Sequence, residues 1–462
     1  MADAMFVVDS RKNRYELGRR LGEGGQGVVF EVKGGKLAAK LLRTRDASQV
    51  RTLENQMHFL RSLDLAGIPI AQPEAVIVHP SPGYLMRLLA DMRPLQEAMV
   101  PSPTMTGSRA TWYQETGGLR RRLRICARAA RAISLLHAKG LCYGDVSPQN
   151  VYVSTAVTND QVVLIDADNL RYASDPANKA LYTPGYGAPE VVKGLSMASS
   201  LADAHALAVT VFRMLTLAHP LIGDMVEEGE PELEERALRG DFPWIDHLRD
   251  RANSSSRGIA RDRVMSESML RLAARVFGEG LTVPTDRPSA GEWADVLERA
   301  ALNCVKCKAC PATFLRTARS CPWCGGVRTA YLQGRIRLWD PELAAGNGGY
   351  VLGPDRRDIV VASFVIMPDE GIVLDRRLVR EVPTHQASQP CLKIGFDGKR
   401  LTLACRDADS TMQVHVPKGS PLTLTDRELE FRSEVPYLTI HVGDTRSVHR
   451  AIDFRIEQEQ SV

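Results

Sequence analysis

The chain has 462 residues, of which 44% are hydrophobic and 25% charged, so it is long enough for more than one hydrophobic core. Its formal net charge of +4 excludes the strongly basic surface of a dedicated nucleic-acid-binding protein. No apolar run approaches the roughly 18 residues of a membrane span and the N-terminus has no export signal, so we expect a cytoplasmic protein that contacts neither membrane nor nucleic acid.

The first chemical pattern is a glycine-rich stretch with the spacing G-x-G-x-x-G: Gly22, Gly24 and Gly27. Alternating apolar residues continue beyond the last glycine, which predicts two strands joined by a turn. A dinucleotide-binding fingerprint would need a helix there, so that interpretation is disfavoured. Backbone rich in glycine can approach a triphosphate closely, and Lys40 follows in the apolar strand predicted over 37–42.

Four further elements precede the central motif. Apolar spacing predicts a helix over 48–63, strands over 75–78 and 84–89, and a second helix over 119–137 that ends at Lys139-Gly140. Arginines cluster at the start of this second helix, at positions 120, 121, 122 and 124. We interpret that cluster as a solvated helix face.

The central motif reads G-D-V-S-P-Q-N, with Asp145 and Asn150 five residues apart. Two short strands are predicted after it, over 151–153 and 162–165, and Asp166 follows directly. A carboxylate and an amide can supply oxygen ligands to Mg²⁺, while a second carboxylate orients a hydroxyl. This pattern predicts phosphoryl transfer.

Two later motifs complete a family resemblance: YTPGYGAPE over 182–190, and Asp286-Arg287-Pro288. With the glycine-rich stretch, Lys40 and the central motif, they follow the order found in eukaryotic-like Ser/Thr protein kinases, which residues 14–300 resemble. The resemblance implies a bilobal fold, ATP and Mg²⁺ as cofactors, and a protein substrate. It also implies that Asp203 braces the catalytic loop and that Arg287 pairs with Glu190.

The resemblance assigns roles to individual residues. Lys40 would grip the α- and β-phosphates, Asn150 and Asp166 would hold Mg²⁺, and Asp145 would orient the hydroxyl and accept its proton. The three glycines would cover the phosphates. Further nucleotide contacts would come from Val29, Met86, Leu88 and Ala90.

The sequence departs from the family at four places. The helix acid that pairs with the lysine is replaced by Gln56 at its expected position, and Glu54 has the right chemistry but lies about 200° around the helix, so the choice between them stays open. Tyr143-Gly144 replaces His-Arg, Ser147 replaces a lysine, and Ala167-Asp168 replaces Phe-Gly. The missing arginine is the group that would pair with a phosphate on the activation loop. We therefore expect a kinase that is not switched on by phosphorylation of that loop. These changes predict weakened activity, and a nucleotide-binding pseudokinase scaffold is the alternative.

Five of the nine cysteines lie between positions 304 and 324. The pairs Cys307-x₂-Cys310 and Cys321-x₂-Cys324 have the spacing of a zinc ribbon, whose four thiolates would close a structural Zn²⁺ site. Cys304 is an alternative ligand in the first pair. The sequence C-P-x-x-F, which begins at Cys310, fits a zinc knuckle better.

Short strand patterns recur from Tyr331 onward and predict an all-β sandwich. Residues 350–354 and 440–444 faintly resemble forkhead-associated phosphothreonine-binding domains, but the basic residue expected after Gly353 is Pro354. We therefore expect a docking or structural sandwich.

The complete prediction is a multi-domain α+β protein: kinase N-lobe 14–92, kinase C-lobe 93–302, zinc ribbon 303–328 and β-sandwich 329–462. This order resembles bacterial kinases that work with a von Willebrand A domain protein and a metal-dependent phosphatase in stress-response modules.

Overall fold

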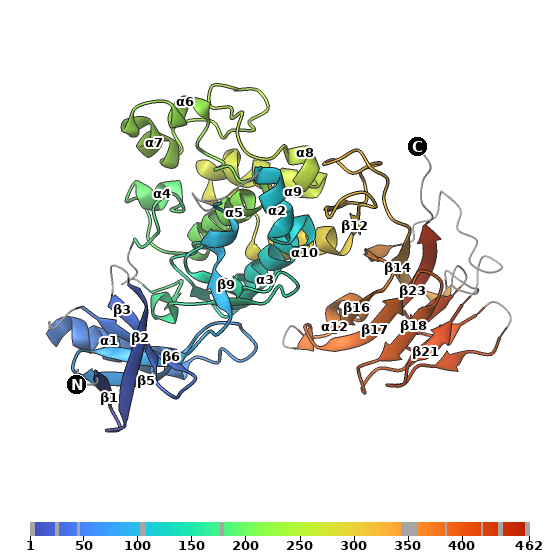
Figure 1. Cartoon of the computed structure of the whole chain (residues 1–462), viewed down its shortest axis with the longest axis horizontal. Coiled ribbons are helices and arrows are strands. Elements are labelled where there is room, and N and C mark those ends of the chain that lie inside the picture. The colour runs from blue at the N-terminus through green and yellow to red at the C-terminus, as the bar shows by residue number, and fades with distance from the viewer. Residues whose placement is uncertain are drawn as a thin grey trace. The chain divides into compact units, whose positions relative to one another are not determined.

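The structure is a computed structural model that describes residues 5–23, 27–43, 47–101, 108–175, 180–342, 359–383, 386–416, 419–432 and 438–457. The described residues of 1–112 and 121–297 form one compact unit, and those of 113–120 and 298–462 form a second (Figure 1). Within these ranges no helix combines the length and apolar character required to cross a bilayer.

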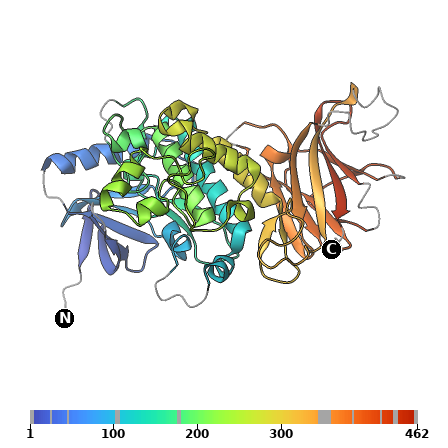
Figure 2. The same cartoon turned by 90° about the horizontal axis from the view of Figure 1, so that it is seen from above.

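The first unit opens with an antiparallel sheet closed into a barrel in the order β1-β2-β3-β4-β6-β5, blue in Figures 1 and 2. Its elements are β1 Phe6–Asp9, β2 Arg14–Glu23, β3 Gly27–Val32, β4 Leu37–Leu42, α1 Ala47–Ser62, β5 Pro73–His79 and β6 Gly83–Arg87. Inward apolar side chains such as Val7, Ala39 and Leu85 fill the barrel. Strand β1 begins before the predicted N-lobe and closes the sheet by pairing with both β2 and β5.

The rest of the first unit is mainly helical. Its elements are β7 Met92–Pro94, η1 Leu95–Ala98, α2 Arg109–Glu115, α3 Gly118–Ala138, β8 Leu141–Cys142, β9 Val151–Ser154, β10 Val162–Leu164, η2 Ala167–Asn169, β11 Arg171–Tyr172, α4 Pro189–Val192, α5 Ser200–Thr216, α6 Asp224–Glu227, α7 Pro231–Leu238, α8 Arg261–Val264, α9 Glu267–Phe277, η3 Glu279–Leu281, η4 Pro284–Asp286 and α10 Ala290–Leu302. The predicted helices over 48–63 and 119–137 and the strands flanking Asp166 are confirmed.

Helix α5 begins where the Ser199 hydroxyl accepts a hydrogen bond from the Ala202 amide at 3.2 Å, the usual N-cap arrangement. Most of its side chains are buried, which makes it the central helix of this unit. It ends at Leu217, whose φ of 57° lies in the left-handed region.

The arginine cluster of α3 is a solvated face only in part: Arg124 is exposed, but the interpretation was wrong for two of the four arginines. Arg121 and Arg122 are buried, and their guanidinium groups donate to backbone carbonyls of neighbouring segments, including Ser154 at 2.6 Å and Ala98 at 2.5 Å. The two guanidinium groups therefore supply hydrogen-bond donors to backbone carbonyls of β9 and η1, because a buried carbonyl needs a donor.

The second unit is β-rich. Its elements are β12 Cys304–Lys306, β13 Thr313–Leu315, β14 Tyr331–Trp339, β15 Val360–Ile366, β16 Glu370–Asp375, α12 Arg376–Val379, β17 Pro390–Phe396, β18 Leu401–Cys405, β19 Met412–His415, β20 Leu422–Thr423, β21 Leu429–Phe431, β22 Thr439–Val442 and β23 His449–Glu457, orange to red in Figure 2. A six-stranded sheet, β15-β14-β23-β22-β19-β20, and a four-stranded sheet, β16-β17-β18-β21, contribute to one hydrophobic core that includes Phe364, Leu392 and Ile452. The segment 350–354 of the forkhead-associated resemblance lies outside the described residues.

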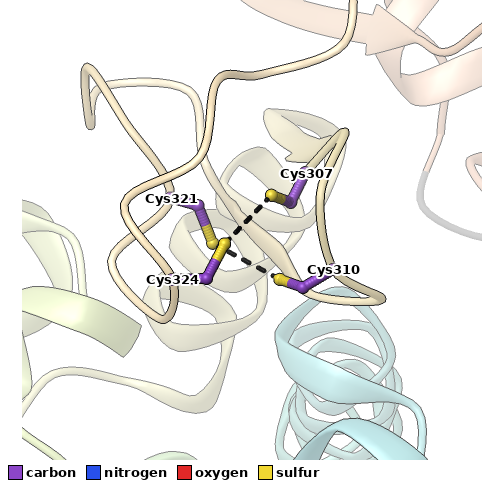
Figure 3. A group of neighbouring side chains, drawn as sticks. All are labelled: Cys307, Cys310, Cys321 and Cys324. Atoms are coloured by element: carbon purple, nitrogen blue, oxygen red, sulfur yellow. Dashed lines mark hydrogen bonds between the residues drawn. The ribbon is translucent and has the colours of Figure 1, made fainter.

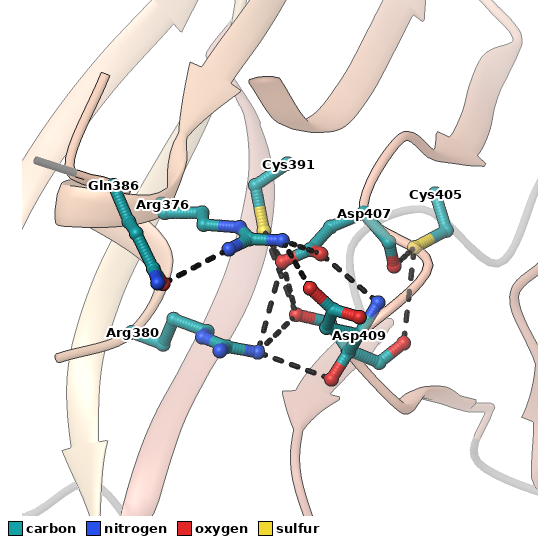
Figure 4. Close-up of polar contacts among 8 residues, drawn as sticks. Arg376, Arg380, Gln386, Cys391, Cys405, Asp407 and Asp409 are labelled. Atoms are coloured by element: carbon teal, nitrogen blue, oxygen red, sulfur yellow. Dashed lines mark hydrogen bonds and ion pairs between the residues drawn. The ribbon is translucent and has the colours of Figure 1, made fainter. Parts of the chain in front are cut away.

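A buried ion pair ties α12 to the loop after β18 (Figure 4). The Arg376 guanidinium pairs with Asp407, whose carboxylate also accepts from the Ser410 hydroxyl at 2.5 Å. Burial raises the pKa of Asp407, but its bonds to Ser410 and Arg376 outweigh this and lower it overall. Cys391 donates to the same carboxylate at 3.6 Å and is a free thiol whose pKa burial raises to about 12.

Candidate active site and cysteine cluster

Lys40 lies on β4 and is 4% exposed. Its Nζ is 3.0 Å from Asp166 Oδ1 and 3.3 Å from Asp168 Oδ2. Burial opposes its charge, yet the carboxylates of Asp168 and Asp166 outweigh that cost, so the pKa of Lys40 is raised.

Helix α1 does not supply the acid that pairs with Lys40 among the described residues. The ion pairs described for Lys40 go to Asp166 and Asp168, and Glu54 forms none with it. Gln56 donates from Nε2 to the Leu170 carbonyl at 2.9 Å, so it fastens α1 to the segment that follows Asp168.

The glycine hairpin is formed by β2 and β3, with Gly22 opposite Val29. A Cβ at Gly22 would meet no atom within 4 Å, whereas one at Gly27 would lie 2.2 Å from the Leu41 carbonyl oxygen. Gly27 is therefore required by the close approach of β4. Gly24 lies outside the described residues.

Residues assigned to the adenine side lie at the end of β6 and just after it. Met86 is 9% exposed and forms part of the sheet. The Leu88 amide donates to the Lys36 carbonyl at 2.7 Å, so this donor is used within the protein, and Ala90 is exposed in the turn that follows.

Asp145 is held by two neighbours. Asn150 Nδ2 donates to Asp145 Oδ2 at 2.9 Å, and the Thr183 hydroxyl donates to Asp145 Oδ1 at 2.8 Å. Asn150 is buried, and its amide nitrogen is directed at Asp145, which leaves its amide oxygen for another partner. Thr183 was not predicted as a site residue, although its hydroxyl touches the predicted base.

The loop that carries Asp145 is braced from α5. Asp203 accepts hydrogen bonds from the Tyr143 amide at 2.6 Å and the Gly144 amide at 2.9 Å, and its Oδ2 lies 3.1 Å from His137 Nε2. One carboxylate thereby satisfies two backbone donors of this loop. Arg287 forms two 2.7 Å bonds to the carboxylate of Glu190, the pairing that the resemblance implied.

Tyr143 has a role that the sequence did not show. Its side chain is fully buried, and its hydroxyl donates to the Ile165 carbonyl and lies 3.3 Å from the Asn150 carbonyl. These bonds join the loop to the strand end before Asp166. Ser147 is also fully buried, and its hydroxyl has no hydrogen-bond partner among the described residues.

Asp166 follows β10 with φ 53° and ψ 49°, a left-handed conformation. Burial raises its pKa against the attraction of Lys40, and Asp168 and Asp145 add to the rise. Asp166 and Asp168 thus share one lysine while the charge of Asp145 also acts on Asp166, and this excess of negative charge suits a divalent cation.

The second unit gathers four cysteines (Figure 3). The sulfurs of Cys307, Cys310, Cys321 and Cys324 all lie within 4.8 Å of one another, with Cys307–Cys324 at 3.5 Å and Cys310–Cys321 at 3.7 Å. Cys304 is outside this group: its buried thiol donates to the Ala300 carbonyl at 3.4 Å.

The local backbone explains why the four sulfurs meet. The amides of Ala309 and Gly326 donate to Cys307 Sγ at 3.3 Å and Cys324 Sγ at 3.4 Å, so each knuckle turns its N–H groups toward sulfur. A Cβ at Gly326 would come within 3.3 Å of two of the sulfurs. Phe314 is fully buried in the cluster that packs beneath.

Comparisons with known proteins agree with the motifs of the first unit. The model of the protein kinase domain matches residues 15–294. Serine/threonine-protein kinase PknD of Mycobacterium tuberculosis is 30% identical over 235 residues, 49% of this chain and 33% of that protein.

Two other relatives give similar values. The DNA damage-responsive serine/threonine-protein kinase RqkA of Deinococcus radiodurans is 29% identical over 233 residues, 46% of this chain and 31% of that protein. Serine/threonine-protein kinase PknB of Mycolicibacterium smegmatis is 27% identical over 238 residues, 48% of this chain and 35% of that protein. The alignments thus span about a third of the length of these relatives. The family model covers well over half of the chain, which therefore belongs to the protein kinase family.

Proposed function

We propose that this chain is an ATP·Mg²⁺-dependent serine/threonine protein kinase that transfers the γ-phosphate of ATP to a protein hydroxyl. The observation that carries the proposal is the setting of Asp145. One carboxylate oxygen is fixed by the Asn150 amide, and the other accepts a hydrogen bond from a threonine hydroxyl at 2.8 Å. A substrate hydroxyl needs the same carboxylate geometry before transfer.

The residues present suit a magnesium-bound triphosphate. Asp166 and the amide oxygen of Asn150 are the groups that would hold Mg²⁺, and both are hard oxygen donors. When bound, the metal would neutralise charge on the phosphates. Lys40 stays protonated because its pKa is raised, so it can bind phosphate oxygens.

In the transfer step, the substrate oxygen forms a bond to the γ-phosphorus while the bond from that phosphorus to the leaving ADP oxygen breaks. Asp145 orients the hydroxyl and accepts its proton. Asp203 holds the loop so that this carboxylate stays in place.

The test is transfer of radiolabelled γ-phosphate from Mg·ATP to casein or to the chain itself, compared between wild type and Asp145→Asn. We expect a loss of about 10²-fold or more, because general-base groups contribute at least that much. Asp64→Asn is the matched control, since Asp64 is exposed and forms a surface ion pair with Lys139. Similar rates for wild type and Asp145→Asn would reject the role of Asp145.

A second candidate is a nucleotide-binding pseudokinase that acts as a scaffold. It is favoured by Ser147, which is neutral and buried where the family has a charged lysine. Wild-type protein that binds Mg·ATP but transfers no phosphate would support the scaffold over the enzyme.

We also propose that Cys307, Cys310, Cys321 and Cys324 bind one structural Zn²⁺. Four cysteine sulfurs within 4.8 Å can surround a tetrahedral ion, and a closed thiolate sphere leaves no position for a substrate. For the whole protein, we propose a role in bacterial signalling alongside a von Willebrand A domain protein and a metal-dependent phosphatase. The order of kinase, cysteine cluster and β-rich region supports that proposal.

A further inference from the structure

Lys40 has two acidic neighbours on one segment, Asp166 and Asp168, and they differ in their surroundings. Asp168 contacts Lys40 through both carboxylate oxygens, at 3.4 and 3.3 Å, and also accepts a hydrogen bond from the Tyr84 hydroxyl at 2.9 Å. Asp166 contacts Lys40 through one oxygen at 3.0 Å. Asp168 is therefore the carboxylate with more fixed partners.

The two acids also differ in how far their side chains are exposed to solvent. The side chain of Asp168 is 12% exposed and that of Asp166 is 24% exposed. The charge of Asp145, the carboxylate that accepts from the Thr183 hydroxyl, also helps to raise the pKa of Asp166. Asp166 is thus the more accessible of the two carboxylates, and Asp168 is the one held by side chains of both β4 and β6.

Tyr84 explains how Asp168 is held there. It lies directly opposite Lys40 on β6, and its side chain is 1% exposed. Its ring centroid is 5.6 Å from Lys40 Nζ, so lysine, tyrosine and aspartate form one buried group. A tyrosine hydroxyl in such a place needs an acceptor, and Asp168 provides it.

We propose that Asp168 is the positioning residue for Lys40, held by the Tyr84 hydroxyl, so that Asp166 is left to bind the metal. The family places this acid on the helix that corresponds to α1, where this chain has Gln56 bound to a carbonyl instead. If Asp166 alone paired with Lys40, the lysine would compete with Mg²⁺ for it. This inference rests on the proposed kinase function.

The experiment uses the full chain and measures two quantities. The first is the ratio of ATP dissociation constants without and with Mg²⁺, by titration calorimetry. We expect Asp168→Asn to keep this ratio within twofold of wild type and Asp166→Asn to reduce it to near one. The second is kcat for transfer to casein or the chain itself, which Asp168→Asn should lower at least tenfold and Tyr84→Phe by a smaller factor. Asp64→Asn should leave both quantities unchanged.

A double-mutant cycle shows whether Asp168 acts through Lys40. In a Lys40→Met background, Asp168→Asn should change neither kcat nor the Mg·ATP dissociation constant by more than twofold. An effect of Asp168→Asn that persists in that background, or loss of the magnesium dependence in Asp168→Asn alone, would overturn the assignment. So would wild-type kcat in Asp168→Asn.

Failure of the kinase proposal can be told apart from failure of this inference. Wild-type protein that transfers no phosphate would reject the kinase. The magnesium ratio and the cycle on nucleotide affinity would still decide between the two aspartates.

Discussion

At the scale of single residues, the departures from the family motif have structural roles of their own. Tyr143 joins the loop that carries Asp145 to the end of the strand before Asp166, because its hydroxyl bonds to the Ile165 carbonyl as well as to the Asn150 carbonyl. Gly144 has φ 83°, a conformation that side-chain-bearing residues rarely adopt, and its amide donates to Asp203. The arginine that receives a loop phosphate in other kinases is thus replaced by a residue that the backbone itself requires.

Restoring the family arginine should therefore harm the protein. Gly144→Arg should lower the free energy of unfolding by about 1–2 kcal/mol, because a left-handed backbone is strained for residues other than glycine. Urea denaturation measures this. The control is Gly35→Arg, where φ is not left-handed and the nearest atom to a new Cβ is 3.7 Å away. A Gly144→Arg protein with wild-type stability and phosphorylation-dependent activity would contradict the prediction.

At the scale of elements, α5 and the loop after it hold the segment that carries Thr183. Arg213 donates to the Tyr186 hydroxyl at 2.5 Å. His219 Nδ1 accepts from the Leu221 amide at 3.1 Å, so Nε2 carries the hydrogen and donates to the Gly185 carbonyl at 2.8 Å. Two contacts thus fasten adjacent residues of the turn that follows Thr183.

This arrangement predicts a pH dependence of stability. Burial lowers the pKa of His219 to about 3, although its bond to the Gly185 carbonyl works in the opposite direction. The native imidazole stays neutral while the unfolded chain takes up a proton below about pH 6.5. The contribution of His219 is therefore complete above pH 6.5 and falls as the pH drops toward 3, by at most about 2 kcal/mol between pH 6.5 and 5.

Urea unfolding of wild type and His219→Gln at pH 7 and pH 5 checks this dependence. Glutamine keeps a donor for the Gly185 carbonyl but does not titrate, so the variant should lose less stability on acidification. An equal loss in both proteins would show that His219 is not the titrating group.

At the scale of the whole molecule, the proposed nucleotide site and the proposed zinc site fall in different compact units. The predicted ATP site belongs to residues 1–112 and 121–297, and the cysteine cluster belongs to the other unit. Sites in separate cores should be disrupted separately, because each core buries its own apolar surface.

Loss of zinc should therefore spare nucleotide binding. Wild type should carry one zinc per chain by elemental analysis, Cys310→Ser and Cys324→Ser should lose it, and Cys304→Ser should keep it, because the Cys304 thiol is bonded to the Ala300 carbonyl. All these variants should retain the thermal stabilisation given by Mg·ATP. Full zinc in Cys310→Ser with loss in Cys304→Ser would reverse the ligand assignment.

Patterns that lie within one short stretch could be predicted from the sequence. The glycine hairpin, the capped helix at 119–137 and the strands around Asp166 each have a local period or turn residue that dictates the conformation. The two C-x-x-C pairs likewise predicted four sulfurs that the structure brings together.

The strands β14 and β23 pair over nine residues near the middle of the larger sheet, a pairing that no local pattern indicates. Both carry charged residues that blur the alternation of apolar positions. Arg337 of β14 and Asp453 of β23 form an ion pair that exists only when the two strands lie side by side. The sequence alone therefore does not show why these charges occur in strands.

The sequence by itself determined which chemical groups the chain possesses and the local elements that carry them, because these depend on residue type and short spacing. Tertiary structure alone decided which of those groups meet. Lys40 pairs with acids 126 and 128 residues away instead of one on the nearby helix, and Arg121 and Arg122 are buried instead of solvated. Such contacts depend on how distant segments of the chain pack together, and a local sequence pattern does not specify that packing.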